Sequence, residues 1–174
     1  NVHDVRLTDG RIRGIERTRN GVDWGWFPDP WRFVRCGWKP GARRLIIFEE
    51  HSTNKTMPIG TGKIVVDSLT YADDANGEPY YHDQIVYCDD TPDSKVQMNT
   101  WRRELAIRVH PARKARMRRL SYEWLAGLCE IVIDSQRCPL TFSEFTLKEF
   151  ERDKEGNWID DIPDGNDHSI DAVR

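Results

Sequence analysis

Residues 21–49 read GVDWGWF, PDP, WRFVRCGW, KPGA and, after one further arginine, RLIIFE. Three runs rich in aromatic and β-branched residues are separated by short connections that contain proline or glycine, and such runs favour β-strands. We expect strands over Gly21–Phe27, Trp31–Trp38 and Arg44–Glu49. Because connections this short favour tight reversals of the chain, the three strands are predicted to form an antiparallel meander.

Helical and strand patterns alternate after this meander. Helices are expected over Lys63–Ala72, Lys95–Glu104, Ala112–Leu128 and Pro139–Phe145, and strands over Gln84–Cys88, Leu105–Val109 and Glu130–Ile133. The third of these helices is expected to bury an apolar face made of Met117, Leu120, Trp124 and Leu128. The fold class is therefore α/β, with a mixed central sheet and helices on both of its faces.

The size of the chain suits a single folded domain. Its 174 residues, 38% of them hydrophobic, can bury one core. The segment Asn1–Asn20 is polar and Arg-rich with little periodicity, so we expect an arm or linker there and the domain over residues 21–174. The chain starts without methionine and stops inside a helical pattern, and we expect it to be a piece of a longer protein. The absence of a membrane-length apolar run and the scattered cysteines predict a soluble, intracellular protein with reduced thiols.

Carboxylates occur at three separated places in the chain. Asp23 lies inside the first predicted strand, where a buried carboxylate is costly unless it is paired or binds a metal. Asp89, with Asp90 beside it, follows the fourth predicted strand, at the end where α/β sheets usually bind ligands. His168 and Asp171 are three residues apart and would share one face of a helix. Each alone would suit an ordinary turn, but together they indicate a site for hard divalent cations such as Mg²⁺.

The net charge of −3 hides a strong division of charge along the chain. Between Trp101 and Leu120, eight basic side chains face a single acid, Glu104, and the stretch from Glu144 to Asp171 is mainly acidic. The basic side chains are Arg102, Arg103, Arg108, Arg113, Lys114, Arg116, Arg118 and Arg119. Such a run can contact the phosphates of DNA, and the alternative is an ordinary solvated helix face.

The order of several motifs resembles the nuclease domain of tailed-bacteriophage terminase large subunits, from about Arg19 to the end of the chain. These motifs are Arg19–Trp26 followed by Phe27–Pro30, Ile85–Asp89, Glu130–Asp134 with Arg137–Pro139, and Asn166–Arg174. The resemblance implies a ribonuclease H-like fold and an endonuclease that cuts concatemeric viral double-stranded DNA during genome packaging. It also implies two divalent ions, Mg²⁺ or Mn²⁺, that support hydrolysis of the phosphodiester.

The resemblance carries the metal site over to four positions of this chain. They are Asp23, Asp89, His168 and Asp171, with Asp23, Asp89 and Asp171 as the metal ligands. Two alternatives stay open. Asp90 could replace Asp89 as a ligand, and Asp167, which directly precedes His168, could be a further or alternative metal ligand. The second acidic motif reads Asp-Asp-Thr-Pro-Asp here, where the family commonly has Asp-Ser-Ala-Glu-Pro.

The partners implied by the resemblance are double-stranded DNA, the ATPase motor domain of the full-length terminase, the terminase small subunit and the portal of the procapsid. Residues 1–20 would be the linker to the motor, and the isolated domain would be a monomer in the host cytoplasm without contact to a membrane. Two other functions are compatible with the residues. One is a ribonuclease H-like module that docks DNA or a partner and has weak activity when isolated. The other is a Holliday-junction resolvase or a transposase-type nuclease, since these enzymes also use acidic triads.

Overall fold

The computed structural model describes residues 1–72, 79–81, 84–112, 118–148, 155 and 165–174. The main sheet has seven strands within these ranges, in the order β1-β9-β4-β3-β2-β7-β8. Its strands are β1 (Val2–Asp4), β2 (Thr18–Asp23), β3 (Trp31–Lys39), β4 (Arg44–Thr53), β7 (Val86–Asp89), β8 (Val109–Ala112) and β9 (Glu130–Ile133). Two further strands, β5 (Thr70–Ala72) and β6 (Pro79–Tyr81), pair with each other.

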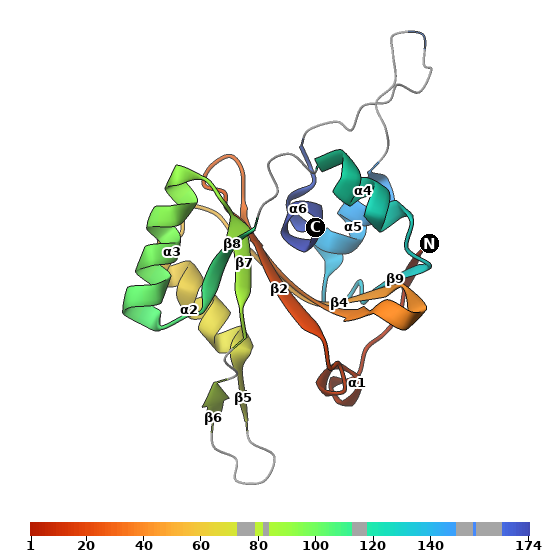
Figure 1. The fold of residues 1–174 in the computed structure, drawn as a ribbon, viewed down its shortest axis with the longest axis horizontal. Coiled ribbons are helices and arrows are strands. Elements are labelled where there is room, and N and C mark those ends of the chain that lie inside the picture. The colour runs from red at the N-terminus through yellow and green to blue at the C-terminus, as the bar shows by residue number, and fades with distance from the viewer. Residues whose placement is uncertain (73–78, 82–83, 113–117, 149–154, 156–164) are drawn as a thin grey trace.

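The helices lie on both faces of the main sheet, as Figure 1 shows. They are α1 (Asp9–Arg13), α2 (Pro58–Leu69), α3 (Pro92–Leu105), α4 (Arg118–Ala126), α5 (Pro139–Leu147) and α6 (His168–Val173), and a short 3₁₀ turn, η1, covers Pro40–Ala42. Strands β2, β3 and β4 form the predicted antiparallel meander. On one side of the meander, β7 pairs with β2 and β8 with β7, and on the other side β9 pairs with β4 and β1 with β9. All four of these pairings are parallel. The predicted α/β class with a mixed sheet is therefore confirmed.

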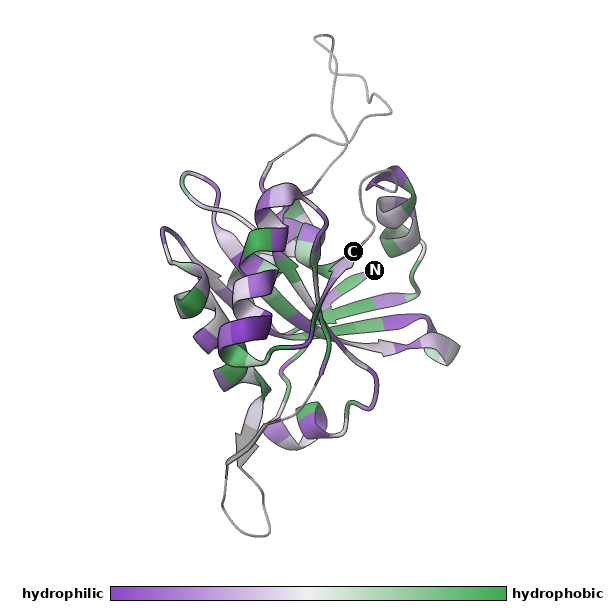
Figure 2. Ribbon diagram, turned by 60° about the vertical axis from the view of Figure 1, so that its left-hand side comes forward, coloured by the Kyte–Doolittle hydropathy of each residue, from purple (hydrophilic) through white to green (hydrophobic). Residues whose placement is uncertain are grey.

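Two apolar cores lie on opposite faces of this sheet. On one face, α2 and α3 pack side chains such as Leu69 and Trp101 against Val22 of β2. On the other face, α4, α5 and α6 pack side chains such as Leu125 and Ile170 against Val34 of β3. Successive residues of a strand point to opposite faces, so the strands supply both cores at once. In Figure 2 the inner strands are accordingly green, whereas the helices carry purple on parts of their surface.

The segment Asn1–Asn20, expected as an arm or linker, contains β1, α1 and the start of β2. β1 pairs in parallel with β9, with Val2 opposite Ile131, and β2 already begins at Thr18. The carboxylate of Asp134 accepts the backbone N–H of Leu7 at 2.8 Å. These contacts use backbone groups and polar side chains, which produce no hydrophobic periodicity in the sequence.

Several predicted boundaries also move. The strand expected over Leu105–Val109 begins only at Val109, because α3 continues to Leu105 and ends at Ala106, which has a left-handed backbone. The strand expected over Gly21–Phe27 ends at Asp23, and the helix expected over Lys63–Ala72 covers Pro58–Leu69.

The helix expected over Ala112–Leu128 is described only from Arg118, as α4, and Met117 lies outside the described residues. Its buried side chain is Leu125, whereas Leu120 and Trp124 are 58% and 45% exposed. The predicted apolar face of this helix is therefore corrected, although Leu128, just beyond the helix, is buried. None of the described helices is long and apolar enough to span a membrane.

Candidate metal centre

Asp23 and Asp89 close two neighbouring parallel strands. β2 and β7 pair with Val22 opposite Cys88, and the next residues along the two strands are the two aspartates. Val22 and Cys88 are fully buried in the core beneath α2 and α3. Because side chains alternate along a strand, the aspartates face the opposite side of the sheet, on strands about 4.8 Å apart.

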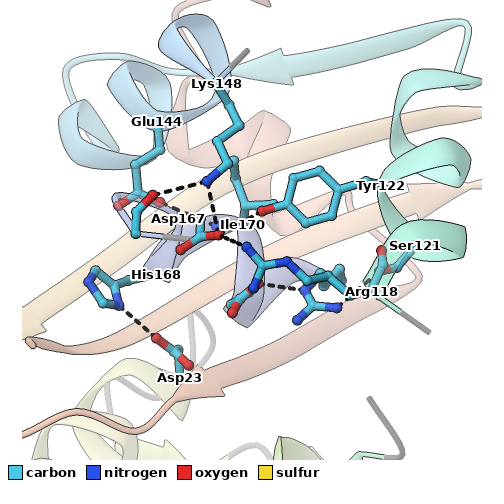
Figure 3. Close-up of polar contacts among 12 residues, drawn as sticks. Asp23, Arg118, Ser121, Tyr122, Glu144, Lys148, Asp167, His168 and Ile170 are labelled. Atoms are coloured by element: carbon cyan, nitrogen blue, oxygen red, sulfur yellow. Dashed lines mark hydrogen bonds and ion pairs between the residues drawn. The ribbon is translucent and has the colours of Figure 1, made fainter. Parts of the chain in front are cut away.

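Helix α6 lies on that same side because Gly21 lets its backbone come close. A Cβ atom built at Gly21 would lie 1.7 Å from the carbonyl oxygen of Ala172, so any larger residue would displace the helix. The close approach places His168, the first residue of α6, beside β2. Its Nδ1 atom lies 2.9 Å from Oδ2 of Asp23 (Figure 3). This hydrogen bond to the Asp23 carboxylate raises the pKa of His168 above its usual value, and burial only partly opposes the shift.

Asp171 follows His168 by one turn of α6, but its carboxylate is engaged by an arginine. Nε of Arg174 donates to Oδ1 of Asp171 at 2.5 Å. The same guanidinium donates through Nη1 to Oγ of Ser121 at 3.1 Å and lies over the ring of Tyr122. The predicted sharing of a helix face by His168 and Asp171 holds in α6. In this structure, however, Asp171 forms an ion pair with the C-terminal end of the helix.

Asp167 and Asp90, the two alternative ligands, have other partners. Oδ2 of Asp167 accepts hydrogen bonds from Arg118 at 2.7 Å, Tyr122 at 2.9 Å and Lys148 at 3.0 Å (Figure 3). Although burial opposes ionisation, these donors hold the pKa of Asp167 below its usual value. Asp90 is exposed and forms an ion pair with Lys95 at 3.1 Å. Asp167 thus ties α4, α5 and α6 together, and Asp90 lies beyond the end of β7.

The predicted ligands are brought to one face of the sheet but not into one coordination shell. Among the residues that the structure describes, no group of three or more His, Cys, Asp or Glu side chains is arranged to hold a metal ion. Within the predicted constellation, Asp23 and His168 are in direct contact. The donor set nevertheless suits Mg²⁺ or Mn²⁺, since carboxylate oxygens with an imidazole are typical ligands of these ions.

Two further charged residues that the sequence did not reveal lie at the site, buried Arg32 and partly buried Glu144. Oε2 of Glu144, on α5, accepts the backbone N–H groups of Ser169 at 2.6 Å and Ile170 at 3.3 Å, at the start of α6. Oε1 of Glu144 accepts from Nη2 of Arg32 at 3.3 Å. Arg32 lies on β3 directly opposite Asp23 in the β2–β3 ladder. The signal for Arg32 in the sequence is a charge inside a mainly apolar strand pattern, because a buried charge requires partners.

The basic stretch does not form one continuous track across the described residues. Arg102 and Arg103 lie in the last turn of α3, and Arg108 just precedes β8. α3 starts after the end of β7 and runs back to the start of β8, so these arginines lie at the far end of the sheet from Asp89. The remaining members divide between α4 and the part of the chain that is not described.

Arg118 and Arg119 lie on α4, on the other face of the sheet, where they pair with Asp167 and Glu123. Arg113, Lys114 and Arg116 lie outside the described residues, so their predicted contact with DNA has no structural description. The described arginines therefore lie on two faces of the sheet. The reason is that the two helices carrying them pack on opposite sides of the sheet.

Comparison with known proteins places this geometry in context. No protein-family model matches the chain. The chain is 29% identical over 170 residues to the terminase large subunit of Bacillus phage SPP1, a match that covers 97% of this chain and 37% of that protein. The chain therefore spans little more than a third of the length of this curated relative.

Solved structures of terminases share the fold. The nuclease domain of g2p, the large terminase of bacteriophage SPP1, solved with bound Mn, superposes with a TM-score of 0.82 at 24% identity, covering 99% of this chain and 92% of that one. The large terminase of a thermophilic bacteriophage has a TM-score of 0.63 at 16% identity, over 99% of this chain and 40% of that one. The large terminase nuclease of another thermophilic phage, G20c, solved with bound magnesium, has a TM-score of 0.55 at 12% identity, over 90% and 78% of the two chains.

The resemblance seen in the sequence is confirmed over nearly the whole chain, which has the ribonuclease H-like fold of the nuclease domain of phage terminase large subunits.

Proposed function

We propose that this chain is the metal-dependent endonuclease domain of a phage terminase, and that it cuts double-stranded DNA during genome packaging. One observation carries the proposal: Asp23 and Asp89 end neighbouring parallel strands on the face where α6 sets His168 against Asp23. The similar nuclease domains from SPP1 and G20c are solved with bound Mn and with bound magnesium, which supports the same donor chemistry here.

Each side chain of the site has a separate role in this proposal. Asp23, held between β3 and β7, would be shared by two divalent ions, while Asp89 and Asp171 would each complete the shell of one of them. Bound in this way, the ions would lower the pKa of the attacking water and stabilise the departing 3′ oxygen. His168 is held by its hydrogen bond to Asp23 and would orient the water or bind an ion. Asp171 would exchange its ion pair with Arg174 for an ion.

The wider context of the enzyme belongs to the same proposal. The similar large terminase of a thermophilic bacteriophage, of which this chain covers about two fifths, is solved in complex with ADP and with ATP-gamma-S. These complexes support an ATPase motor domain as the partner of this nuclease in one chain. We further propose double-stranded DNA, the small subunit and the procapsid portal as partners, in the host cytoplasm. Residues 1–20, which contain β1, α1 and the start of β2, would form the connection to that motor.

Cleavage of a supercoiled plasmid tests this proposal. In Mn²⁺ or Mg²⁺ the domain is expected to nick or linearise the plasmid, and EDTA is expected to stop the reaction. Asp23→Asn and Asp89→Asn should each lower the rate at least about 100-fold, because a neutral amide is a poor ligand for a hard cation. Asp90→Asn is the matched control: it changes the adjacent carboxylate, which pairs with Lys95, and should leave the rate within about twofold.

Three outcomes would count against the proposal. Unchanged cleavage by Asp23→Asn would remove the metal mechanism. Loss of activity in Asp90→Asn with full activity in Asp89→Asn would move the ligand by one residue. Strong preference for four-way DNA junctions over linear duplex would indicate a resolvase instead.

A further inference from the structure

We infer that Glu144 and Arg32 form a latch that positions α6 against Asp23, and that the affinity of the site for divalent ions depends on this latch. The inference rests on the proposed function of the same site and adds two positioning residues to it. Glu144 comes from α5 and Arg32 from β3. The latch thus joins two elements that carry none of the proposed metal ligands.

Glu144 holds the start of α6 directly. Its Oε2 atom accepts the N–H groups of Ser169 and Ile170, two of the donors that a helix start leaves without partners inside the helix. Nothing in α6 itself does this, since its N-cap residue Asp167 makes no capping hydrogen bond with its side chain. Since α6 is only six residues long, its orientation depends on contacts of this kind.

Arg32 fixes the other end of the latch beside Asp23. It lies opposite Asp23 in the antiparallel ladder of β2 and β3, and its side chain is 5% exposed. Nη2 reaches Oε1 of Glu144 at 3.3 Å, so one carboxylate connects the strand next to Asp23 with the helix that carries His168. The Nε and Nη1 atoms of Arg32 are buried without a hydrogen-bond partner. Unpaired buried donors of a cation are costly, and such groups are retained where the structure serves a function.

Glu144 acts as a positioning residue rather than as a metal ligand. Both of its carboxylate oxygens are engaged, one by Arg32 and the other by the two backbone N–H groups. Partners of this kind, which orient the groups that touch a metal, typically change metal affinity about 10- to 100-fold when they are removed. We therefore expect the latch to set how well His168 and Asp171 are presented to Asp23.

The chain contains a matched control for the latch. Glu50 of β4 caps the start of α5 in the same way, accepting the N–H groups of Leu140 at 2.9 Å and Thr141 at 2.7 Å. Both glutamates therefore join a helix start to another element, but Glu50 makes no contact with α6 or Asp23 among its recorded hydrogen bonds. Comparing Glu144→Gln with Glu50→Gln separates positioning of the site from general support of a helix.

The experiment uses calorimetric titration of Mn²⁺ into each variant, together with hydrogen–deuterium exchange of the metal-free protein. Glu144→Gln keeps an oxygen for the N–H groups of α6 but turns an NH₂ group toward Arg32, and we expect about 10-fold weaker Mn²⁺ binding. Glu144→Ala removes the cap as well, and we expect up to about 100-fold weaker binding with faster exchange of the Ser169 and Ile170 amides. Glu50→Gln should bind Mn²⁺ within about twofold of wild type.

The possible results separate the latch from the proposed function. If wild type binds Mn²⁺ and cuts DNA while Glu144→Gln and Glu144→Ala bind it equally well, the latch is overturned and the proposed function stands. If wild type neither binds Mn²⁺ nor cuts DNA, the proposed function fails, and with it the dependence of metal affinity on the latch. The exchange of the α6 amides still tests the positioning part in that case. Should Glu144→Ala not fold, Arg32→Lys, which keeps the charge but loses the forked donor, provides the second test of Mn²⁺ affinity.

Discussion

Two buried arginines, three positions apart on β3, face opposite sides of the sheet and differ strongly in how many hydrogen-bond partners they have. Arg35, 1% exposed, donates to Asn20 at 3.0 Å, to Glu49 at 2.8 Å and to the carbonyl of Ser68 at 2.5 Å. Its guanidinium also lies over the ring of Phe48. Arg32, 4% exposed, reaches only Glu144 among its recorded hydrogen bonds and leaves Nε and Nη1 without a partner.

This difference in pairing distinguishes Arg35, which supports the fold, from Arg32, which lies beside the candidate metal site. On the side that carries α2 and α3, every nitrogen of the Arg35 guanidinium has an acceptor or an aromatic ring nearby. The side that carries α6 keeps unpaired donors next to Asp23. A buried charge is tolerated on the first side because it is fully paired. On the second side, incomplete pairing marks the place where we propose that a ligand binds.

The largest effect on stability is expected from removing the fully paired arginine. Arg35→Met should lower the free energy of unfolding by about 3–5 kcal/mol, because it leaves buried partners such as Asn20 and Glu49 without their cation. Urea denaturation followed by tryptophan fluorescence measures this change. A loss below about 1 kcal/mol would mean that the Arg35 network does not support the fold as its geometry indicates.

A smaller loss is expected where a carboxylate joins three helices on the site face. Asp167→Asn keeps the shape of the side chain but weakens its bonds to Arg118, Tyr122 and Lys148, and should cost about 1.5–3 kcal/mol. If Asp167 is structural, Mn²⁺ affinity corrected for the folded fraction should change less than for Asp171→Asn. A greater loss of Mn²⁺ affinity in Asp167→Asn would instead make Asp167 the ligand. Urea denaturation and calorimetry on the two variants decide between these roles.

The fold was predictable from the sequence where local patterns agree with the tertiary structure. The runs around Trp31–Trp38 and Arg44–Glu49 carry their strand signal in adjacent residues, and their connections are too short for any other arrangement than a meander. The edge strand Val2–Asp4 was missed because it is held by backbone pairing with β9 and by polar side chains. Such contacts leave no periodic signal in the sequence.

The candidate site was predictable only in part. Asp23 was expected inside a predicted strand and Asp89 directly after another, and the structure places both at strand ends. Glu144 and Arg32 could not be paired in advance, since they lie 112 residues apart and meet only through the packing of α5 and α6 on β3. The partner of Asp171 likewise depends on where α6 ends. Side chains that position a site are thus harder to predict than those that form it.

A still smaller effect on stability is expected from the arginine with unpaired donors. Arg32→Met should lower the free energy of unfolding by only about 1 kcal/mol, because the loss of the cation beside Glu144 is partly offset by removing the cost of two unpaired N–H groups. The matched comparison is Arg35→Met, which introduces the same side chain on the opposite face of β3. Equal losses in the two variants, measured by urea denaturation, would contradict the distinction between the two arginines.

The smallest effect is expected from the pH dependence of His168 in the metal-free protein. The hydrogen bond to Asp23 raises the pKa of His168 in the folded state, and its neighbours Glu144 and Arg32 act in opposite directions on that pKa. A raised folded-state pKa stabilises the fold fully below the unfolded value of about 6.5, and the contribution disappears as pH rises through the higher folded value. The expected contribution is about 0.5 kcal/mol, the lower end of the net contribution of a single hydrogen bond. Unfolding curves recorded from about pH 5 to about pH 9 in EDTA should therefore show a fall in stability as pH rises. This fall should be missing in His168→Gln. In Arg32→Met it should move to higher pH, because the variant removes a positive charge that lowers the pKa of His168. A fall of the same size and position in His168→Gln would assign it to another group and would remove the Asp23–His168 contact as its cause.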